Sequence, residues 1–86
     1  MNWVYMLRCR DGSLYTGWTN DLEKRLAAHR SGQGSKYTRA RLPVELVWTE
    51  SHESREAAMS REWHLKRLSR QKKLELIRES KKTPTP

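Results

Sequence analysis

Two tyrosines near the start of the chain, Tyr5 and Tyr15, belong to triplets of residues that favour β-strands. Arg25 and His29 follow four residues apart, and a glutamate, Glu62, comes late in the sequence. Phenol, imidazole and carboxylate groups can transfer protons or hold a metal ion, and a guanidinium can neutralise phosphate charge. In a strongly basic chain, this set indicates chemistry on a phosphodiester rather than a purely structural role.

Taken singly, these residues also have ordinary structural interpretations. Arg25 and His29 share one face of an expected helix, and such a pair is more often solvated surface than a site. Tyr5 and Tyr15, one at a time, are typical half-buried aromatic residues of strands. The functional interpretation therefore requires that the folded chain bring the four side chains together.

Glu62 is a more specific signal. At about 100° per residue it lies beside the apolar edge that Ala58 and Leu65 form on an expected helix. An ion pair with Arg61 or Lys66 would explain its position, although a surface pair adds little stability. A single carboxylate with water ligands and a substrate phosphate is, however, a usual way of holding Mg²⁺.

The size and charge of the chain restrict its class. Its 86 residues suit one domain, and 18 basic against 10 acidic side chains give a net charge of +8. This balance favours nucleic acid as partner, whereas the lack of a long apolar run argues against a membrane. The single cysteine, Cys9, cannot form an internal disulfide, so we expect a cytoplasmic protein. Zinc-ligand spacing, a phosphate-binding Gly-Lys-Ser/Thr loop and a nucleophile elbow are lacking.

The apolar patterns and turn residues predict a small α+β domain. In chain order, the expected elements are strands at 3–8 and 14–19, a helix at 21–31, a strand at 44–50, and helices at 55–68 and 70–79. Asn20 is expected to cap the first helix and Gly32 to end it. The domain, residues 1–80, then has a three-stranded antiparallel sheet flanked by three helices in the order ββαβαα, and a disordered tail at 81–86.

The loop between the first two strands decides whether the two phenols share a site. A two-residue turn would place Tyr5 and Tyr15 on opposite faces of the sheet. A three-residue loop with Gly12 in the left-handed conformation would pair Tyr5 with Gly17 and turn both phenols to one face. We adopt the second register because it assembles a site; the local sequence permits both.

The segment 32–43 is expected to be a long loop with three basic residues, Lys36, Arg39 and Arg41, around Tyr37. It is either a plain connection or a nucleic-acid contact, because cations around an aromatic ring suit phosphate binding with base stacking. We assign these residues, with Lys66 on the following helix, to nucleic-acid binding.

Together these positions resemble the GIY-YIG nuclease domain, most closely its small stand-alone bacterial members. The matching segments are Val4-Tyr5, Tyr15-Thr16-Gly17, Arg25, His29, Lys36-Tyr37-Thr38-Arg39, Leu42-Pro43-Val44 and Arg61-Glu62-Trp63-His64-Leu65-Lys66. The resemblance covers residues 3 to about 77 and depends on the order and spacing of motifs that are individually weak. Two departures are Trp18, where excision-repair relatives have a lysine, and the lack of an asparagine after Glu62.

The resemblance implies that water or hydroxide attacks phosphorus, with one divalent ion, Mg²⁺ or Mn²⁺, on Glu62. It implies Tyr5 as general base, Tyr15 orienting water or substrate, and His29 hydrogen-bonding the base or the phosphate. Ionising a phenol at neutral pH costs about 4 kcal/mol, and Arg25 and a hydrated metal ion are expected to lower that cost. Arg25 can also offset charge on the phosphate oxygens.

We therefore expect a metal-dependent endonuclease, with DNA ahead of RNA as substrate. The alternative is a nucleic-acid-binding module that keeps the fold without useful turnover, and a third option is a basic interaction protein, for instance one docking on ribosomes. Because the chain has room for one domain only, the nuclease is expected to be weakly selective, selective for substrate structure, or directed by a partner protein.

Overall fold

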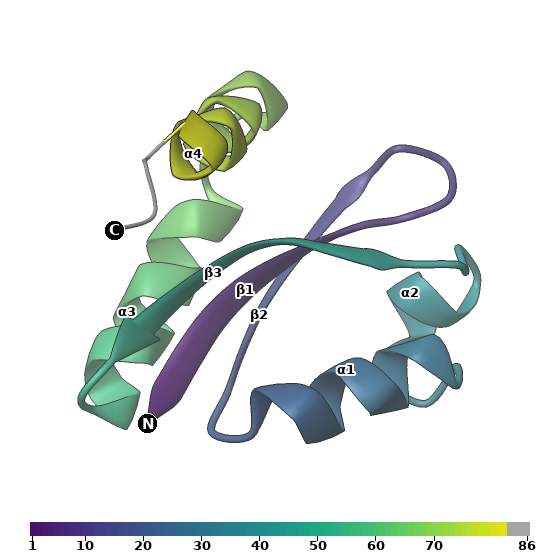
Figure 1. Cartoon of the computed structure of the whole chain (residues 1–86), viewed down its shortest axis with the longest axis horizontal. Helices are drawn as coiled ribbons and strands as arrows, with labels where there is room; N and C mark the ends of the chain where they lie inside the picture. The colour runs from purple at the N-terminus through teal and green to yellow at the C-terminus, as the bar shows by residue number, and fades with distance from the viewer. Residues whose placement is uncertain (83–86) are drawn as a thin grey trace.

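The protein is built on one three-stranded antiparallel sheet with strand order β2-β1-β3 (Figure 1). The computed structural model describes the backbone of residues 1–82 and the side chains of residues 1–80. The elements are β1 (Asn2–Arg8), β2 (Leu14–Thr19), α1 (Leu22–Arg30), α2 (Lys36–Arg39), β3 (Glu45–His52), α3 (Arg55–Lys66) and α4 (Arg70–Lys82). This arrangement confirms the predicted α+β class and the antiparallel sheet.

The hairpin of β1 and β2 has the register that a three-residue loop predicts. Tyr5 is paired with Gly17 and Leu7 with Tyr15. Gly12 has a φ of +85°, and its N–H donates to the Cys9 carbonyl at 2.9 Å. Because side chains alternate along a strand, both phenols lie on the same face of the sheet.

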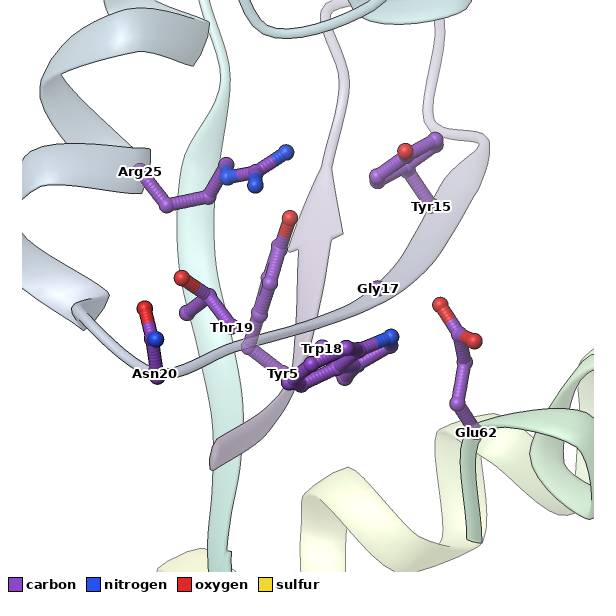
Figure 2. A pocket seen from close by; sticks show the side chains of 8 residues that line it. All are labelled: Tyr5, Tyr15, Gly17, Trp18, Thr19, Asn20, Arg25 and Glu62. Atoms are coloured by element: carbon purple, nitrogen blue, oxygen red, sulfur yellow. The ribbon is translucent and has the colours of Figure 1, made fainter. Parts of the chain in front are cut away.

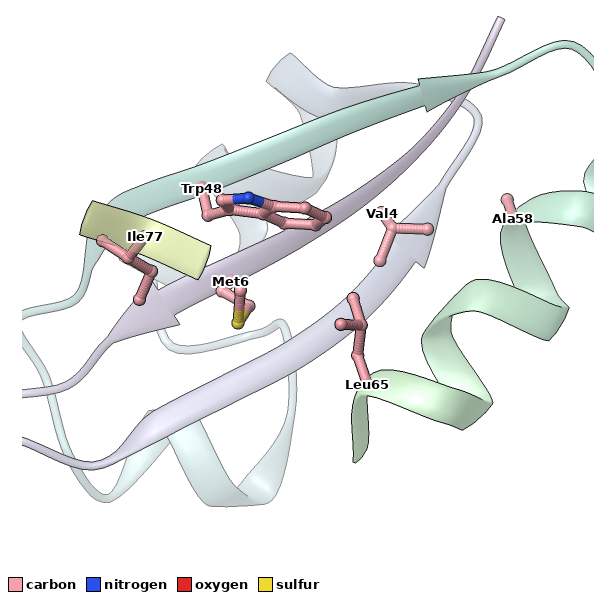
Figure 3. Close-up of a cluster of buried hydrophobic side chains, with 6 residues drawn as sticks. All are labelled: Val4, Met6, Trp48, Ala58, Leu65 and Ile77. Carbon is pink, nitrogen blue, oxygen red and sulfur yellow. The ribbon is translucent and has the colours of Figure 1, made fainter. Parts of the chain in front are cut away.

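The sheet separates an apolar core from a more polar layer. Figure 3 shows the core on one face, where α3 and α4 pack. Its buried members are Val4, Met6, Trp48, Ala58, Leu65 and Ile77. On the other face Tyr5 and Leu7 are buried with His29 of α1 and Thr38 of α2. Burial of polar groups in this second layer requires internal hydrogen-bond partners.

The first helix begins one residue later than predicted. Asp21, not Asn20, is its N-cap, and the Asp21 carboxylate accepts the N–H of Lys24 at 3.1 Å. The Thr19 hydroxyl accepts the N–H of Asp21 at 3.1 Å and so fixes the entry to the helix. Gly32, with a φ of +85°, follows the helix end as predicted.

The segment 32–43 was predicted to be one long loop, but it contains the short helix α2. Ser35 caps α2 by accepting the N–H of Thr38 at 3.1 Å. At the other end of the chain, α4 extends to Lys82, and residues 83–86 of the predicted tail lie outside the described part. Of the helices described, none combines the length and apolarity needed to cross a membrane.

Gly12 provides a test of the hairpin register. A Cβ at this position would have its nearest neighbour, an Arg70 nitrogen, 4.0 Å away, so the penalty of Gly12→Ala is almost purely conformational. We expect Gly12→Ala to lower the free energy of unfolding by about 1–2 kcal/mol and Gly12→Asn by less, because asparagine tolerates the left-handed region. Urea denaturation measures both variants, and an Ala variant as stable as the wild type would contradict the register argument.

Candidate active site

A pocket at the edge strand β2 brings together four of the five residues predicted to act in catalysis or metal binding; His29 does not line it. Its volume is about 410 Å³. The lining residues are Tyr5, Tyr15, Gly17, Trp18, Thr19, Asn20, Arg25 and Glu62, and Figure 2 shows the phenols, the guanidinium and the carboxylate directed toward a common space. Arg25 comes from α1 and Glu62 from α3, which flank opposite faces of the sheet. Both reach the pocket because β2 is at the edge.

Gly17 lets the Tyr5 side chain lie across β2. A Cβ on Gly17 would be 2.5 Å from the Tyr5 hydroxyl oxygen and 2.7 Å from the ring carbon that bears it. Real Cβ atoms do not approach other atoms this closely, so any side chain here would displace the phenol. The glycine of the second triplet is thus required by the position of the tyrosine of the first.

The Tyr5 hydroxyl is the first member of a buried hydrogen-bond chain. It lies 2.9 Å from Nε2 of His29, and Nδ1 of His29 lies 2.9 Å from the Thr38 hydroxyl. The Thr38 hydroxyl is 2.9 Å from that of Ser35. His29 and Thr38 are fully buried, and a Cβ on Gly34 would overlap the imidazole ring. His29 was predicted as a site residue from the sequence, whereas no site role was predicted for Thr38, Ser35 or Gly34.

Burial keeps both members of the first hydrogen bond neutral. It raises the pKa of the Tyr5 phenol above its usual value, and Tyr15 raises it further, whereas Arg25 acts in the opposite direction. Burial, followed by the charge of Arg25, lowers the pKa of His29. The predicted direction of the Arg25 effect is confirmed, since its charge lowers the pKa of Tyr5, but burial and Tyr15 outweigh it and leave the pKa above its usual value.

A neutral imidazole has one donor and one acceptor nitrogen, so two proton arrangements satisfy the chain. In one, the Tyr5 O–H donates to Nε2 of His29 and the Nδ1–H donates to Thr38. In the other, Nε2–H donates to the Tyr5 oxygen and Thr38 donates to Nδ1. In the second arrangement a neutral Tyr5 directs its own O–H away from the imidazole. Only the first arrangement places the Tyr5 proton in the hydrogen bond to Nε2, so it is the one from which Tyr5 can pass a proton to His29.

Tyr15 connects this pair to α2 through aromatic contacts. Its ring centroid lies 6.5 Å from that of Tyr5 and 5.2 Å from that of His29. On its other side it stacks on Tyr37 at 6.1 Å. The predicted nucleic-acid contact Tyr37 is therefore partly a packing residue, although 38% of it is exposed.

Glu62 forms an ion pair with Lys66, one of the two partners that the sequence predicted for it. Its Oε2 lies 3.5 Å from the Lys66 ammonium, and Arg61 pairs with Glu50 instead. Over half of the Lys66 side chain is exposed, so this contact is weak. Within the described part of the chain, no three His, Cys, Asp or Glu side chains group as metal ligands. A lone carboxylate at a polar pocket suits an ion that keeps its waters, such as Mg²⁺.

The basic residues of segment 32–43 divide into two kinds. The Arg41 guanidinium is engaged by other residues of the protein. Its Nε donates to Asp11 at 3.1 Å, its Nη1 donates to the Tyr37 carbonyl at 3.0 Å, and it lies 3.8 Å from the centre of the Tyr37 ring. Lys36 and Arg39 are exposed on α2. The predicted phosphate contacts thus remain available at Lys36 and Arg39, whereas Arg41 has a structural role.

Comparison with known proteins identifies close relatives of the chain. The UPF0213 protein of Clostridium perfringens (strain 13 / Type A) is 58% identical over 77 residues, which cover 90% of this chain and 83% of the relative. A UPF0213 protein of Natronomonas pharaonis is 54% identical over 76 residues, covering 88% and 89%.

Two solved structures are similar to this chain in both fold and sequence. The solution NMR structure of a UPF0213 protein from Bacillus halodurans has a TM-score of 0.59 and 51% identity, covering 90% of this chain and 83% of the other. That of a protein from E. faecalis has a TM-score of 0.65 and 37% identity, covering 99% and 91%. A family model described as the GIY-YIG catalytic domain matches residues 1–75. The chain therefore belongs to the GIY-YIG catalytic domain family, a nuclease-type family.

Proposed function

We propose that the protein is a metal-dependent endonuclease that hydrolyses phosphodiester bonds of nucleic acid, with DNA ahead of RNA. The observation that carries the proposal is the meeting of Tyr5, Tyr15, Arg25 and Glu62 at one pocket, with the Tyr5 hydroxyl bonded to a buried imidazole. The net charge of +8 supports a polyanionic substrate. The GIY-YIG family supports the reaction class.

The hydrogen-bond chain supports a relay rather than a free phenolate. As water attacks phosphorus, the Tyr5 oxygen takes a proton from the water while its own proton moves to Nε2 of His29. No free phenolate has to form, which matters because burial raises the pKa of Tyr5. The Thr38 hydroxyl accepts the Nδ1–H of His29 and holds the imidazole in the accepting tautomer.

Arg25 has two effects in this scheme. It lines the pocket, where a guanidinium can bind phosphate oxygens and offset the negative charge that develops during attack. Its charge also lowers the pKa of His29, which keeps the imidazole neutral and able to accept a proton. The negative charge of a bound phosphate would offset this second effect when His29 becomes protonated.

Glu62 is the residue that would hold the divalent ion, Mg²⁺ or Mn²⁺. Bound there, the ion would supply Lewis-acid stabilisation of phosphate and leaving-group charge. Glu62 lines the pocket, its side chain is 21% exposed, and its ion pair with Lys66 is weak. The remaining ligands would be waters and substrate oxygens.

A binding module without turnover is the second candidate. The observations that favour it are the raised pKa of Tyr5, the engagement of Glu62 with Lys66, and Trp18 in the pocket. Such a module would use the same basic surface. Cleavage and binding therefore have to be measured separately on the same variants.

Glu62→Gln separates the two candidates. We expect single-turnover cleavage with Mg²⁺ or Mn²⁺ to fall about a thousandfold, since a catalytic metal ion contributes several kcal/mol. Binding, measured by fluorescence anisotropy, should persist or tighten because a negative charge leaves a phosphate site. The control is Glu56→Gln, an exposed carboxylate in the first turn of the same helix. A Glu62→Gln variant that cleaves as fast as the wild type would contradict the assignment of Glu62 as metal ligand. A wild type that binds DNA or RNA but cleaves neither would overturn the nuclease proposal in favour of the binding module.

The relay predicts that Tyr5 and His29 act as a unit. Tyr5→Phe and His29→Gln should each lower the rate by about 10²–10⁴-fold, the usual contribution of general acid–base catalysis. The double variant should lose little more than the worse single variant, because either change already breaks the proton path. Circular dichroism checks that each variant is folded. Losses that multiply in the double variant would show independent roles and overturn the relay.

Burial of neutral His29 predicts a pH dependence of stability. In the unfolded chain His29 binds a proton below about pH 6.5. The folded protein resists protonation because the pKa of His29 is lowered. Stability should therefore be full above about pH 6.5 and fall as the pH drops toward the folded pKa, by at most about 1.4 kcal/mol per pH unit. Urea unfolding should give a flatter profile for His29→Gln than for the exposed control His64→Gln. Equal profiles would contradict the prediction.

A further inference from the structure

A second pocket, of about 260 Å³, adjoins the candidate active site along strand β2. We call it the β2-edge pocket; it is lined by Leu14, Tyr15, Thr16, Tyr37, Lys66 and Lys73. It shares Tyr15 with the active-site pocket. Lys66 also contacts Glu62 at 3.5 Å, so a cation of the second pocket lies beside the proposed metal ligand of the first.

The β2-edge pocket has two ammonium groups and no carboxylate among its lining residues. Lys66 comes from the end of α3 and Lys73 from α4. Partial burial, followed by the neighbouring charge of Lys66, lowers the pKa of Lys73. Two like charges held near each other in a partly buried space favour an anion between them.

Thr16 supplies a second, independent observation. Its hydroxyl oxygen is buried and has no hydrogen-bond partner among the described residues, and the residue as a whole is 3% exposed. Buried hydroxyl groups in folded proteins almost always have a partner, so an isolated one calls for an explanation. Thr16 lines the same pocket as the two lysines, so an anion that reached its buried hydroxyl there would give it the missing acceptor.

We propose that the β2-edge pocket binds the nucleic-acid backbone phosphate next to the one that is cleaved. Lys66 and Lys73 would supply the charge, and the Thr16 hydroxyl would donate a hydrogen bond to a phosphate oxygen. Tyr37 lines the same pocket, with its ring held between neighbours by Arg41 and Tyr15. This subsite rests on the proposed function, because its position is defined relative to the Glu62 site.

The first test compares two neighbouring lysines of α4. Lys73 is half-buried in the pocket, whereas Lys72 is exposed, so Lys73→Met and Lys72→Met remove the same charge from different surroundings. Anisotropy of a short fluorescein-labelled DNA oligonucleotide in EDTA, measured over a range of salt, gives affinity and salt slope. Lys73→Met should weaken binding several-fold and reduce the slope by about one unit, with a smaller effect for Lys72→Met. Equal effects of the two substitutions would mean diffuse attraction only and would overturn the subsite.

Thr16→Val tests the hydroxyl with almost no change of shape. Removing a buried group without a partner should raise the Tm of the free protein by a few degrees. The same substitution should weaken oligonucleotide binding several-fold, because one donor to the phosphate is lost. A merely structural hydroxyl would change the Tm without changing the affinity, and that result would overturn its assignment to the subsite.

Two further arms identify the source of the phosphate and separate this inference from the proposed function. If Lys73→Met weakens oligonucleotides with and without a 5′-phosphate equally, the ligand is a backbone phosphate; a loss confined to the phosphorylated one points to a terminal phosphate and overturns the assignment. If the wild type cleaves nucleic acid and the Lys73→Met variant binds it as tightly as the wild type, the subsite is overturned and the nuclease proposal stands. If the wild type cleaves no substrate but Lys73→Met weakens binding, the phosphate pocket stands and the nuclease proposal is overturned.

Discussion

The buried hydrogen bond between Tyr5 and His29 is the interaction on which the rest of the site depends. It joins strand β1 to helix α1 across the polar layer of the sheet, at 2.9 Å. Two glycines make room for it, since a Cβ on Gly17 would strike the phenol and one on Gly34 the imidazole. The Thr38 hydroxyl, on the short helix α2, then bonds the far nitrogen of the imidazole at 2.9 Å.

The same burial defines the chemistry available to this pair. A desolvated phenol is hard to ionise and a desolvated imidazole is hard to protonate, so a proton shared between them is easier to move than one released to water. The edge position of β2 lets a cation, Arg25, and an anion, Glu62, approach the phenol from opposite faces of the sheet. Lys66 links this arrangement to the neighbouring basic pocket.

Local sequence rules predicted what depends on local geometry. Gly32 gave the correct helix end. The hairpin register is correct too, but the local sequence permitted two loops, and the three-residue loop was chosen because it brings both phenols to one face. The first helix cap was wrong by one residue, because Asn20 and Asp21 are both good capping residues and only the contacts of the folded chain distinguish them. The raised pKa of Tyr5 and the internal role of Arg41 were not predictable locally, since burial and partners thirty residues away determine them.

The proposed proton relay depends most on a neutral His29 that accepts the hydrogen bond of the Tyr5 phenol. Nitrogen-15 NMR of the histidine side chains at neutral pH reports this state directly, because protonated and unprotonated ring nitrogens differ widely in chemical shift. We predict that Nδ1 of His29 carries the proton, directed to Thr38, and that Nε2 is unprotonated. An imidazolium with both nitrogens protonated, or a solvent-exposed ring exchanging freely with water, would contradict the account.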